Sequence, residues 1–204
     1  MEPTLVSIDA GTTGVSCVLF DARLEPIARA YREFEQHFPQ PGWVEHDGAQ
    51  ILAAVDATLA EIAAHPRARA AVGLGIANQR ETVFALERAT GRALRRGIVW
   101  QDRRTAARCA ELRAAGHEPL LERLTGLRLD PYFSATKIEW MLREDAALAR
   151  RARAGEVVFA TVDALVSKHL CGGEDVSTDP TNASRTLCYD LEQRRWSERA
   201  CELF

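Results

Sequence analysis

The sequence has few lysines, no paired-cysteine motif and no long apolar run. Lys137 and Lys168 are the only lysines among its 26 basic residues, and the others are arginines. We attribute this bias to coding composition and assign it no function. No stretch reaches the roughly 18 apolar residues of a membrane-spanning helix, so we expect no membrane span. The first residues, Met-Glu-Pro-Thr, also lack the basic region and apolar core of a signal peptide.

The cysteines and the net charge narrow the class of protein further. The five cysteines are scattered, odd in number and without a Cys-x-x-Cys pair: Cys17, Cys109, Cys171, Cys188 and Cys201. This usage favours reduced thiols and a cytoplasmic location over a disulfide framework. The formal net charge of −3 provides no basic surface for a nucleic acid, so we expect no nucleic-acid partner.

The size and composition of the chain are those of a soluble globular protein. Its 204 residues are 47% hydrophobic and 27% charged, which is enough for a sizeable core. The length suits one large domain, or a domain with part of another.

The opening of the chain predicts a β-hairpin with a polar turn. Asp9 ends the first apolar run, and the turn that follows contains Gly11, Thr12, Thr13 and Gly14. The glycines permit positive φ and a close approach of the backbone to a ligand. The threonines add N–H and O–H donors that can surround phosphate oxygens, while a nearby carboxylate holds Mg²⁺ directly or through water. An ordinary hairpin with turn-forming residues is the alternative.

The pattern of apolar residues continues with a strand, a helix and further short strands. The strands are expected at residues 26–34, 72–77, 83–86 and 98–100, and the helix at 47–65. A mixed sheet with three consecutive antiparallel strands, followed by parallel strands joined by helices, accommodates this order. We therefore expect an α/β protein of the ribonuclease-H-like fold that actin-like ATPases and sugar kinases share. The remainder predicts helices at 105–115, 119–124, 134–142, 145–154 and 162–170, a strand at 157–160, an irregular segment at 178–185 and the start of a helix at 197–204.

Polar and aromatic residues follow the expected strands. Arg80 and Glu81 provide donors and acceptors that suit vicinal hydroxyls, and the Trp100 indole suits the C–H face of a polyol. Tyr132 adds a phenol from a loop between helices. From the tetrapeptide at residues 78–81 alone, a surface ion pair is the favoured explanation for Arg80 and Glu81. Core packing is the alternative explanation for the two aromatic residues. In open α/β sheets, ligands bind outside the carboxyl ends of the strands. We therefore expect Asp9, Arg80 and Trp100 to converge on one binding site at that edge of the sheet.

Six motifs together resemble the glycerol kinases of the FGGY family of carbohydrate kinases. They are Asp-Ala-Gly-Thr-Thr at 9–13, Pro-Gly-Trp-Val-Glu-His-Asp at 41–47, Asn-Gln-Arg-Glu-Thr at 78–82, Val-Trp-Gln-Asp-Arg-Arg-Thr at 99–105, Asp-Pro-Tyr-Phe-Ser at 130–134 and Thr-Asn-Ala-Ser-Arg-Thr at 181–186. Their order and spacing match over essentially all of the chain. The resemblance implies transfer of the ATP γ-phosphoryl group to glycerol, which gives sn-glycerol 3-phosphate.

The resemblance also implies roles for individual residues. The glycerol-binding set is Arg80, Glu81, Trp100 and Tyr132. The set that meets the nucleotide phosphates is Thr12, Thr13 and Gly14, and Asp9 serves Mg²⁺. Two positions depart from the family pattern, since Gly14 stands where glycerol kinases usually have Ser and Ser16 stands where they have a phosphate-facing Arg. A lesser departure is Pro180, where Tyr is frequent.

The resemblance covers only the first part of a family member. Glycerol kinases have roughly 500 residues in two domains, so we expect residues 1–204 to form a truncated N-terminal domain without the adenosine-binding domain. The general-base Asp is expected beyond Phe204, and Asp102 and Asp130 are expected to have structural roles. We predict that the 204-residue chain alone is inactive or nearly so, and that the full-length protein is a homo-oligomer. Two alternatives are another FGGY polyol or sugar kinase and a non-catalytic actin-like binding module.

Overall fold

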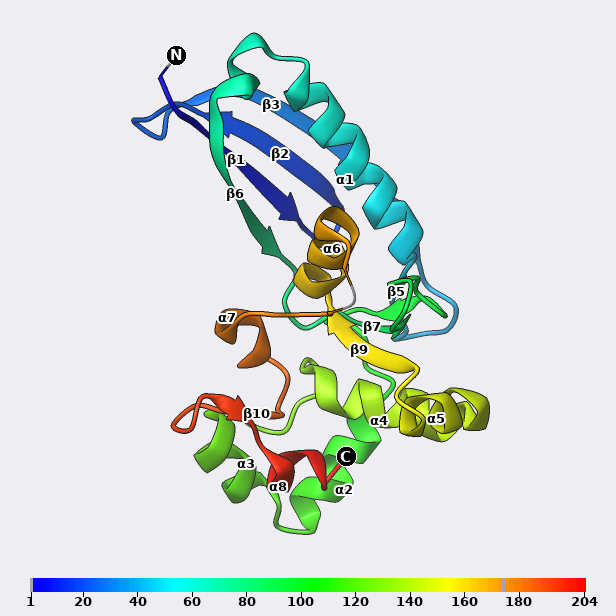
Figure 1. Ribbon diagram of the computed structural model, residues 1–204. Coiled ribbons are helices and arrows are strands. Elements are labelled where there is room, and N and C mark those ends of the chain that lie inside the picture. The colour runs from blue at the N-terminus through cyan, green and yellow to red at the C-terminus, as the bar shows by residue number, and fades with distance from the viewer. Residues whose placement is uncertain (1, 174) are drawn as a thin grey trace. The chain divides into compact units, whose positions relative to one another are not determined.

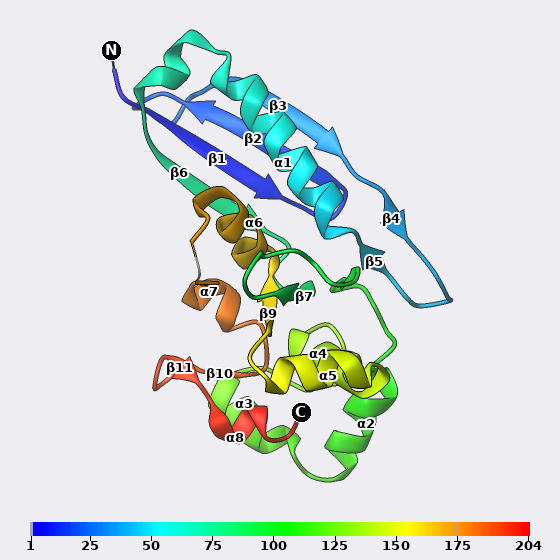
Figure 2. The ribbon, with the colours of Figure 1, turned by 45° about the vertical axis from the view of Figure 1, so that its right-hand side comes forward.

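The computed structural model describes residues 2–173 and 175–204 and divides into two compact units (Figures 1 and 2). The first unit contains Met1–Gln36 and His46–Gln79. The second contains His37–Glu45 and Arg80–Phe204. Each unit has its own sheet and core, so the two are described separately.

The first unit is built on a four-stranded mixed sheet in the order β3-β2-β1-β6. These strands are β1 (Thr4–Ala10), β2 (Gly14–Phe20), β3 (Pro26–Glu33) and β6 (Ala71–Asn78). β2 pairs antiparallel with both β1 and β3, whereas β6 runs parallel to β1. The predicted order of three antiparallel strands followed by a parallel one is confirmed.

Helix α1 (Gly48–Ala63) lies along one face of this sheet (Figures 1 and 2). The Asp47 carboxylate caps the helix by accepting a hydrogen bond from the Ala49 amide at 2.8 Å. The apolar residues Ile51, Val55 and Ile62 recur at helical spacing and are buried. A short 3₁₀ turn that begins at Pro66 then leads into β6.

The second unit contains most of a five-stranded sheet in the order β4-β5-β8-β7-β9. The strands are β4 (Gln36–His37), β5 (Glu45–His46), β7 (Val83–Glu87), β8 (Gly97–Ile98) and β9 (Val157–Thr161). β7 pairs antiparallel with β8 and β9, and its residues Val83 to Leu86 are buried. A continuous apolar run of this kind is expected of a strand with both faces covered.

Helices make up much of the rest of the second unit. They are α2 (Ala106–Ala114), α3 (Glu118–Thr125), α4 (Ser134–Glu144), α5 (Ala146–Arg153), α6 (Val162–Cys171), α7 (Pro180–Ala183) and α8 (Glu198–Cys201). A two-stranded ribbon of β10 (Tyr189–Asp190) and β11 (Arg195–Trp196) precedes α8. The first five agree with the predicted helices to within a few residues.

The short helix α7 lies in a segment that the sequence analysis expected to be irregular. Its N-terminus is capped by the Asp179 carboxylate, which accepts from the Thr181 amide at 2.6 Å and the Asn182 amide at 3.0 Å. A single turn with few apolar residues has no periodicity to detect, and only the Asp-Pro start signalled it. In the described part of the chain, no helix combines the length and apolar character needed to cross a membrane.

Candidate functional site

The predicted phosphate turn connects β1 and β2 in the first unit. Asp9 is exposed in the last part of β1, where it pairs with Ser16 of β2 and Ala77 of β6. The Gly11 amide donates to the Gly14 carbonyl oxygen at 3.0 Å, which closes the turn. Asp9 therefore stands at the end of a strand beside a tight polar turn, as the sequence predicted.

Gly14 is required in this turn by a close contact and not by its backbone angle. Neither Gly11 nor Gly14 takes a positive φ, so that part of the expectation is wrong. A Cβ on Gly14 would lie 2.5 Å from the Arg32 carbonyl oxygen and 2.7 Å from the Tyr31 hydroxyl. The close approach of β3 thus excludes a side chain, and the Tyr31 hydroxyl lies within hydrogen-bond distance of the Thr13 hydroxyl, at 3.3 Å.

Gln79 holds the turn from the end of β6. Its amide N–H donates to the Ala10 carbonyl at 3.1 Å, and its side-chain Nε2 donates to the Gly11 carbonyl at 3.0 Å. Gln79 is buried, and its Nε2 also lies 3.1 Å from His46 Nδ1. Sequence reasoning singled out the Asn-Gln-Arg-Glu segment but assigned Gln79 no role, because a glutamine after a strand has no distinctive signal.

An arginine from β3 reaches Ser16. The Arg29 Nε donates to the Ser16 hydroxyl at 3.2 Å across the β2–β3 pair. Ser16 lies opposite Asp9 on one side and Tyr31 on the other, so these side chains share one face of the sheet. A guanidinium from the neighbouring strand therefore stands beside position 16.

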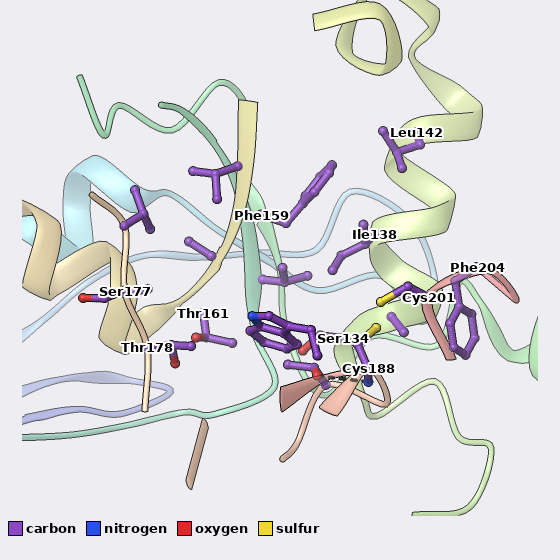
Figure 3. Close-up of a pocket in the computed structure, with 18 residues that line it drawn as sticks. Ser134, Ile138, Leu142, Phe159, Thr161, Ser177, Thr178, Cys188, Cys201 and Phe204 are labelled. Carbon is purple, nitrogen blue, oxygen red and sulfur yellow. Dashed lines mark hydrogen bonds between the residues drawn. The ribbon is translucent and has the colours of Figure 1, made fainter. Parts of the chain in front are cut away.

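The second unit contains a cavity of about 300 Å³ that is separate from the predicted polyol-binding residues (Figure 3). Its lining is mostly apolar and comes from β9, α4 and the C-terminal segment, with Ile138, Phe159 and Phe204 among its walls. None of Arg80, Glu81, Trp100 and Tyr132 lines it.

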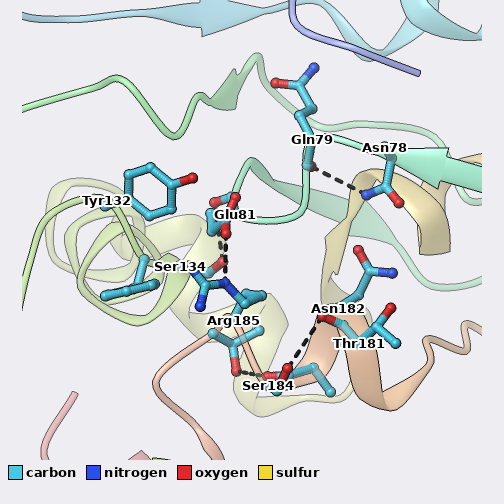
Figure 4. Close-up of polar contacts among 12 residues, drawn as sticks. Asn78, Gln79, Glu81, Tyr132, Ser134, Thr181, Asn182, Ser184 and Arg185 are labelled. Atoms are coloured by element: carbon cyan, nitrogen blue, oxygen red, sulfur yellow. Dashed lines mark hydrogen bonds and ion pairs between the residues drawn. The ribbon is translucent and has the colours of Figure 1, made fainter. Parts of the chain in front are cut away.

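Glu81 is the most buried of the predicted polyol-binding residues. Only 3% of it is exposed, and its Oε1 accepts a hydrogen bond from Arg185 Nε at 2.8 Å (Figure 4). Its carbonyl oxygen accepts from Ser134 Oγ at 3.1 Å. The partner of Glu81 is thus an arginine far along the chain and not the adjacent Arg80.

Trp100 and Tyr132 lie beside each other, with ring centroids 5.4 Å apart. Trp100 was expected at the end of a parallel strand, but β8 is antiparallel to β7 and ends two residues earlier. The Trp100 amide instead donates to the Thr82 hydroxyl at 3.2 Å. This contact fixes the Trp100 backbone in a loop, where the sequence predicted the end of a strand.

Charged groups on Glu81, Arg185 and Arg80 act on the Tyr132 phenol in the second unit. Burial, followed by the Glu81 carboxylate, raises the pKa of the Tyr132 phenol, while Arg185 and Arg80 oppose the shift. Figure 4 shows the Tyr132 hydroxyl directed to the side on which Glu81 lies. The Arg185 guanidinium also lies 6.0 Å from the centroid of the Tyr132 ring. Arg80 is exposed and close enough for its charge to act on this phenol.

Lys137 organises the backbone around these residues. This fully buried lysine extends from α4, and its Nζ donates to the Tyr132 carbonyl at 2.5 Å, the Phe133 carbonyl at 3.2 Å and the Glu81 carbonyl at 3.5 Å. Burial lowers the pKa of Lys137 to about 7, although nearby carboxylates, Asp102 first, act against the shift. Sequence reasoning missed this residue, whose one signal is a lysine on the apolar face of a helix.

Asp102 and Asp130 have the structural roles expected of them. Asp102 is buried and accepts hydrogen bonds from the Val44 amide at 2.7 Å and from Arg104 Nη2 at 2.8 Å. The Arg104 guanidinium lies 3.7 Å from the ring centroid of Trp43, so Trp43 packs against this ion pair. Asp130 accepts from the Tyr132 amide at 2.8 Å and fixes the loop that carries the phenol.

The sheet of the first unit and the polar cluster of the second define an N-terminal domain of a sugar-kinase type. The chain belongs to the FGGY family of carbohydrate kinases, because the family model for the N-terminal domain matches residues 4–204. The ribonuclease-H-like, actin-like fold expected from the sequence is confirmed by the solved FGGY kinases that share it.

Among curated proteins, the chain is similar to glycerol kinases. It is 50% identical to the glycerol kinase of Rhodospirillum rubrum over 208 residues, which cover 99% of this chain and 41% of that protein. It is 45% identical to glycerol kinase 1 of Pseudomonas aeruginosa over 206 residues, covering 100% of this chain and 42% of that protein. The chain therefore spans about two fifths of the length of the curated relatives it matches.

Solved structures of FGGY kinases support the same family assignment. A Plasmodium falciparum glycerol kinase crystallised with ADP superposes with a TM-score of 0.93 at 30% identity, covering 100% of this chain and 41% of that one. A xylulose kinase from Brucella ovis superposes with a TM-score of 0.85 at 28% identity, covering 97% of this chain and 39% of that one. The resemblance found in the six sequence motifs is confirmed.

Proposed function

We propose that this chain provides the glycerol-binding and phosphate-binding part of a kinase that transfers the γ-phosphoryl group of ATP to glycerol and forms sn-glycerol 3-phosphate. The observation that carries the proposal is the 50% identity to a glycerol kinase over 99% of the chain. The cluster around Glu81 supports it, because its residue types suit a small polyol.

The polyol is bound in the second unit by groups of complementary hydrogen-bonding character. Glu81 is acceptor-only when ionised, and Arg185 keeps one of its oxygens oriented. Arg80 adds donors from an exposed position, so a pair of vicinal hydroxyls finds both an acceptor and a donor. Trp100 and Tyr132 offer apolar ring faces to the C–H groups, and Tyr132 offers a hydroxyl as well.

The phosphates are bound in the first unit by the turn after β1. Thr12, Thr13 and Gly14 contribute backbone and hydroxyl groups, and Asp9 would hold Mg²⁺ directly or through water. In the described residues, no group of three or more His, Cys, Asp or Glu side chains is arranged to hold a metal ion. Mg²⁺ keeps several waters and takes oxygen ligands from nucleotide phosphates. Mg²⁺ would neutralise charge on the transferred group.

Arg29 supplies the positive charge that Ser16 lacks. Its Nε already lies 3.2 Å from Ser16 Oγ, on the sheet face that Asp9 occupies. Because phosphoryl transfer depends on positioning and on stabilisation of charge, a guanidinium here compensates for the replaced arginine. Arg29→Ala is expected to weaken binding of magnesium tripolyphosphate to the chain, measured by calorimetry. Arg23→Ala, which changes an exposed arginine in the β2–β3 loop, is the control and should leave binding unchanged.

The chain by itself is expected to bind glycerol weakly and to turn over little or none of it. A general base must reach the hydroxyl whose proton it removes. We assign that base and the adenosine pocket to a separate domain. This domain lies beyond the region of the relatives that is equivalent to residues 1–204. The cytoplasmic location and the homo-oligomeric state of the full-length protein remain predictions.

Calorimetric titration of the chain with glycerol tests the proposal. We expect binding in the millimolar range, weakened at least tenfold by Glu81→Gln and unchanged by Glu122→Gln, which alters an exposed carboxylate in α3. Absence of heat and of a thermal shift at millimolar glycerol would favour the non-catalytic module. Stronger binding of xylulose than of glycerol would favour a different polyol kinase, and a kinase-like rate in a coupled assay with MgATP would contradict the assignment of the base elsewhere.

A further inference from the structure

Two cysteines from neighbouring C-terminal segments meet in the second unit. Cys188 directly precedes β10, and its carbonyl oxygen accepts a hydrogen bond from the Ser197 amide at 2.7 Å. Ser197 also caps α8, and the Cys201 amide donates to the Ser197 carbonyl at 2.9 Å. One helical turn rises about 6 Å over four residues, so Cys201 returns to the region of Cys188.

The thiols of the two residues are in contact. Figure 3 shows both sulfur atoms at the same end of the cavity, directed toward each other. A hydrogen bond between the thiols lowers the pKa of Cys201 to about 7 against the effect of burial. The same hydrogen bond, together with burial, raises the pKa of Cys188. The pair thus combines a sulfur that ionises readily with one that keeps its proton.

Small solutes can reach this pair. Cys201 is exposed and Cys188 is partly exposed, and both line the cavity of about 300 Å³. Cys17 and Cys109 are buried in the described structure, and burial raises the pKa of each thiol. Cys171 is exposed at the end of α6, and it provides a comparison outside the pair.

We propose that Cys188 and Cys201 form a peroxide-reactive dithiol that closes into an intramolecular disulfide. In the first step the Cys201 thiolate attacks one oxygen of hydrogen peroxide, the O–O bond breaks, and the departing hydroxide takes a proton from solvent to become water. Cys201 is then a sulfenic acid. In the second step the Cys188 sulfur attacks the sulfenic sulfur, the S–O bond breaks, and the hydroxyl group leaves with the Cys188 proton as a second water. Two thiols are oxidised and one peroxide is reduced to two waters.

The disulfide would connect β10 to α8 across a loop of about a dozen residues. Closing such a loop restricts the unfolded chain, so the oxidised protein is expected to be more stable than the reduced one. This modification is independent of the proposed kinase function, because neither cysteine belongs to the polyol cluster or to the phosphate turn.

The test is oxidation of the 204-residue chain with a small excess of hydrogen peroxide. We expect the intact mass to fall by two hydrogens, a tryptic peptide pair that links Cys188 to Cys201, and a rise in Tm that dithiothreitol reverses. Persistence of both free thiols after treatment, or covalent dimers in place of the internal bridge, would overturn the proposal.

Three variants make the result specific. Cys201→Ser and Cys188→Ser should each lose the mass change and the rise in Tm, whereas Cys171→Ser should retain both. Should a serine variant fold poorly, alkylation of the native wild-type chain with iodoacetamide provides the same information, since peroxide should protect Cys188 and Cys201 and leave Cys171 reactive. A bridge that still forms in Cys188→Ser would mean that Cys201 pairs elsewhere, which contradicts the proposal.

Discussion

Arg185 and Glu81 form an ion pair, with Nε and Oε1 2.8 Å apart, although 104 positions separate them in the chain. Glu81 follows β6 closely, and Arg185 follows the short helix α7. The side chain of Glu81 is 4% exposed and that of Arg185 is 27% exposed, so the pair is largely withdrawn from water. Removing either partner leaves the other charge desolvated, which makes Arg185 a positioning residue for Glu81.

Arg185→Gln is expected to weaken glycerol binding by about tenfold or more, or about 1.4 kcal/mol, because the Glu81 carboxylate loses its orientation and its compensating charge. Calorimetric titration measures this change. Arg128→Gln is the matched control, since Arg128 is 85% exposed and its ion pair with Glu122 lies at the surface. Equal affinities of Arg185→Gln and wild type for glycerol would show that Arg185 does not position Glu81 for binding.

The buried Lys137 is expected to make stability depend on pH. Its pKa is about 7 in the folded chain against an ordinary value of 10.5, because burial disfavours the charged form. Between these two values the unfolded chain holds a proton that the folded chain has released, so the free energy of unfolding rises with pH. Below about pH 7 both states carry the proton and this dependence disappears.

Urea unfolding at pH 7 and pH 9 checks this dependence. Over that interval, the free energy of unfolding of the wild type should rise by about 2 kcal/mol relative to that of Lys137→Met. The shift is attributed to Lys137 in spite of the charges that oppose it, which belong to Asp102, Glu81, Cys109 and Asp130. Parallel pH profiles of the free energy of unfolding for wild type and Lys137→Met would contradict this attribution.

The turn between β1 and β2 should not tolerate a side chain at Gly14. In Gly14→Ala the new Cβ would lie 2.5 Å from the Arg32 carbonyl oxygen, so the hairpin must shift, at an expected cost of about 2 kcal/mol. Gly11→Ala is the control, because its Cβ would meet its nearest neighbour, the Gly14 carbonyl oxygen, at 3.4 Å. Chemical denaturation of the two variants compares them directly, and equal stabilities would show that β3 yields to the added methyl group.

Asp102 should matter for stability more than Asp130 does. Asp102→Asn removes the charge that faces the buried Arg104 side chain, whose exposure is 1%, and leaves Glu45 as its remaining carboxylate partner. We expect a loss of about 3 kcal/mol in the free energy of unfolding. Asp130→Asn changes a carboxylate that is 44% exposed and should cost less than about 1 kcal/mol. Similar losses in the two variants would mean that Glu45 alone suffices for Arg104.

Much of the fold followed from local patterns. The period of apolar residues placed α1, and Asp47 marked its start. The alternation around Asp9 and the glycine-rich turn placed the first hairpin. Such signals are readable because one face of a helix or strand is buried while the other is not, and the spacing of apolar residues reports that difference.

Other features had no local signal. The two-residue strand β8 is too short to show a period, so the sequence extended it to Trp100 and did not predict its antiparallel pairing. The sequence suggested positive φ as a reason for a glycine at position 14, whereas the actual reason is the close approach of the Arg32 backbone, which belongs to another strand.

The sequence alone therefore determined the family, the order of the main elements and the residue types gathered for a polyol and for phosphates, since these are properties of neighbouring residues and recurring motifs. Only the tertiary structure decided which groups meet. It gave Glu81 the distant Arg185 in place of the adjacent Arg80, set Arg29 beside Ser16, and brought Cys188 against Cys201. Such pairings depend on how separate segments pack, and chain order does not encode the distance between two side chains that packing brings together.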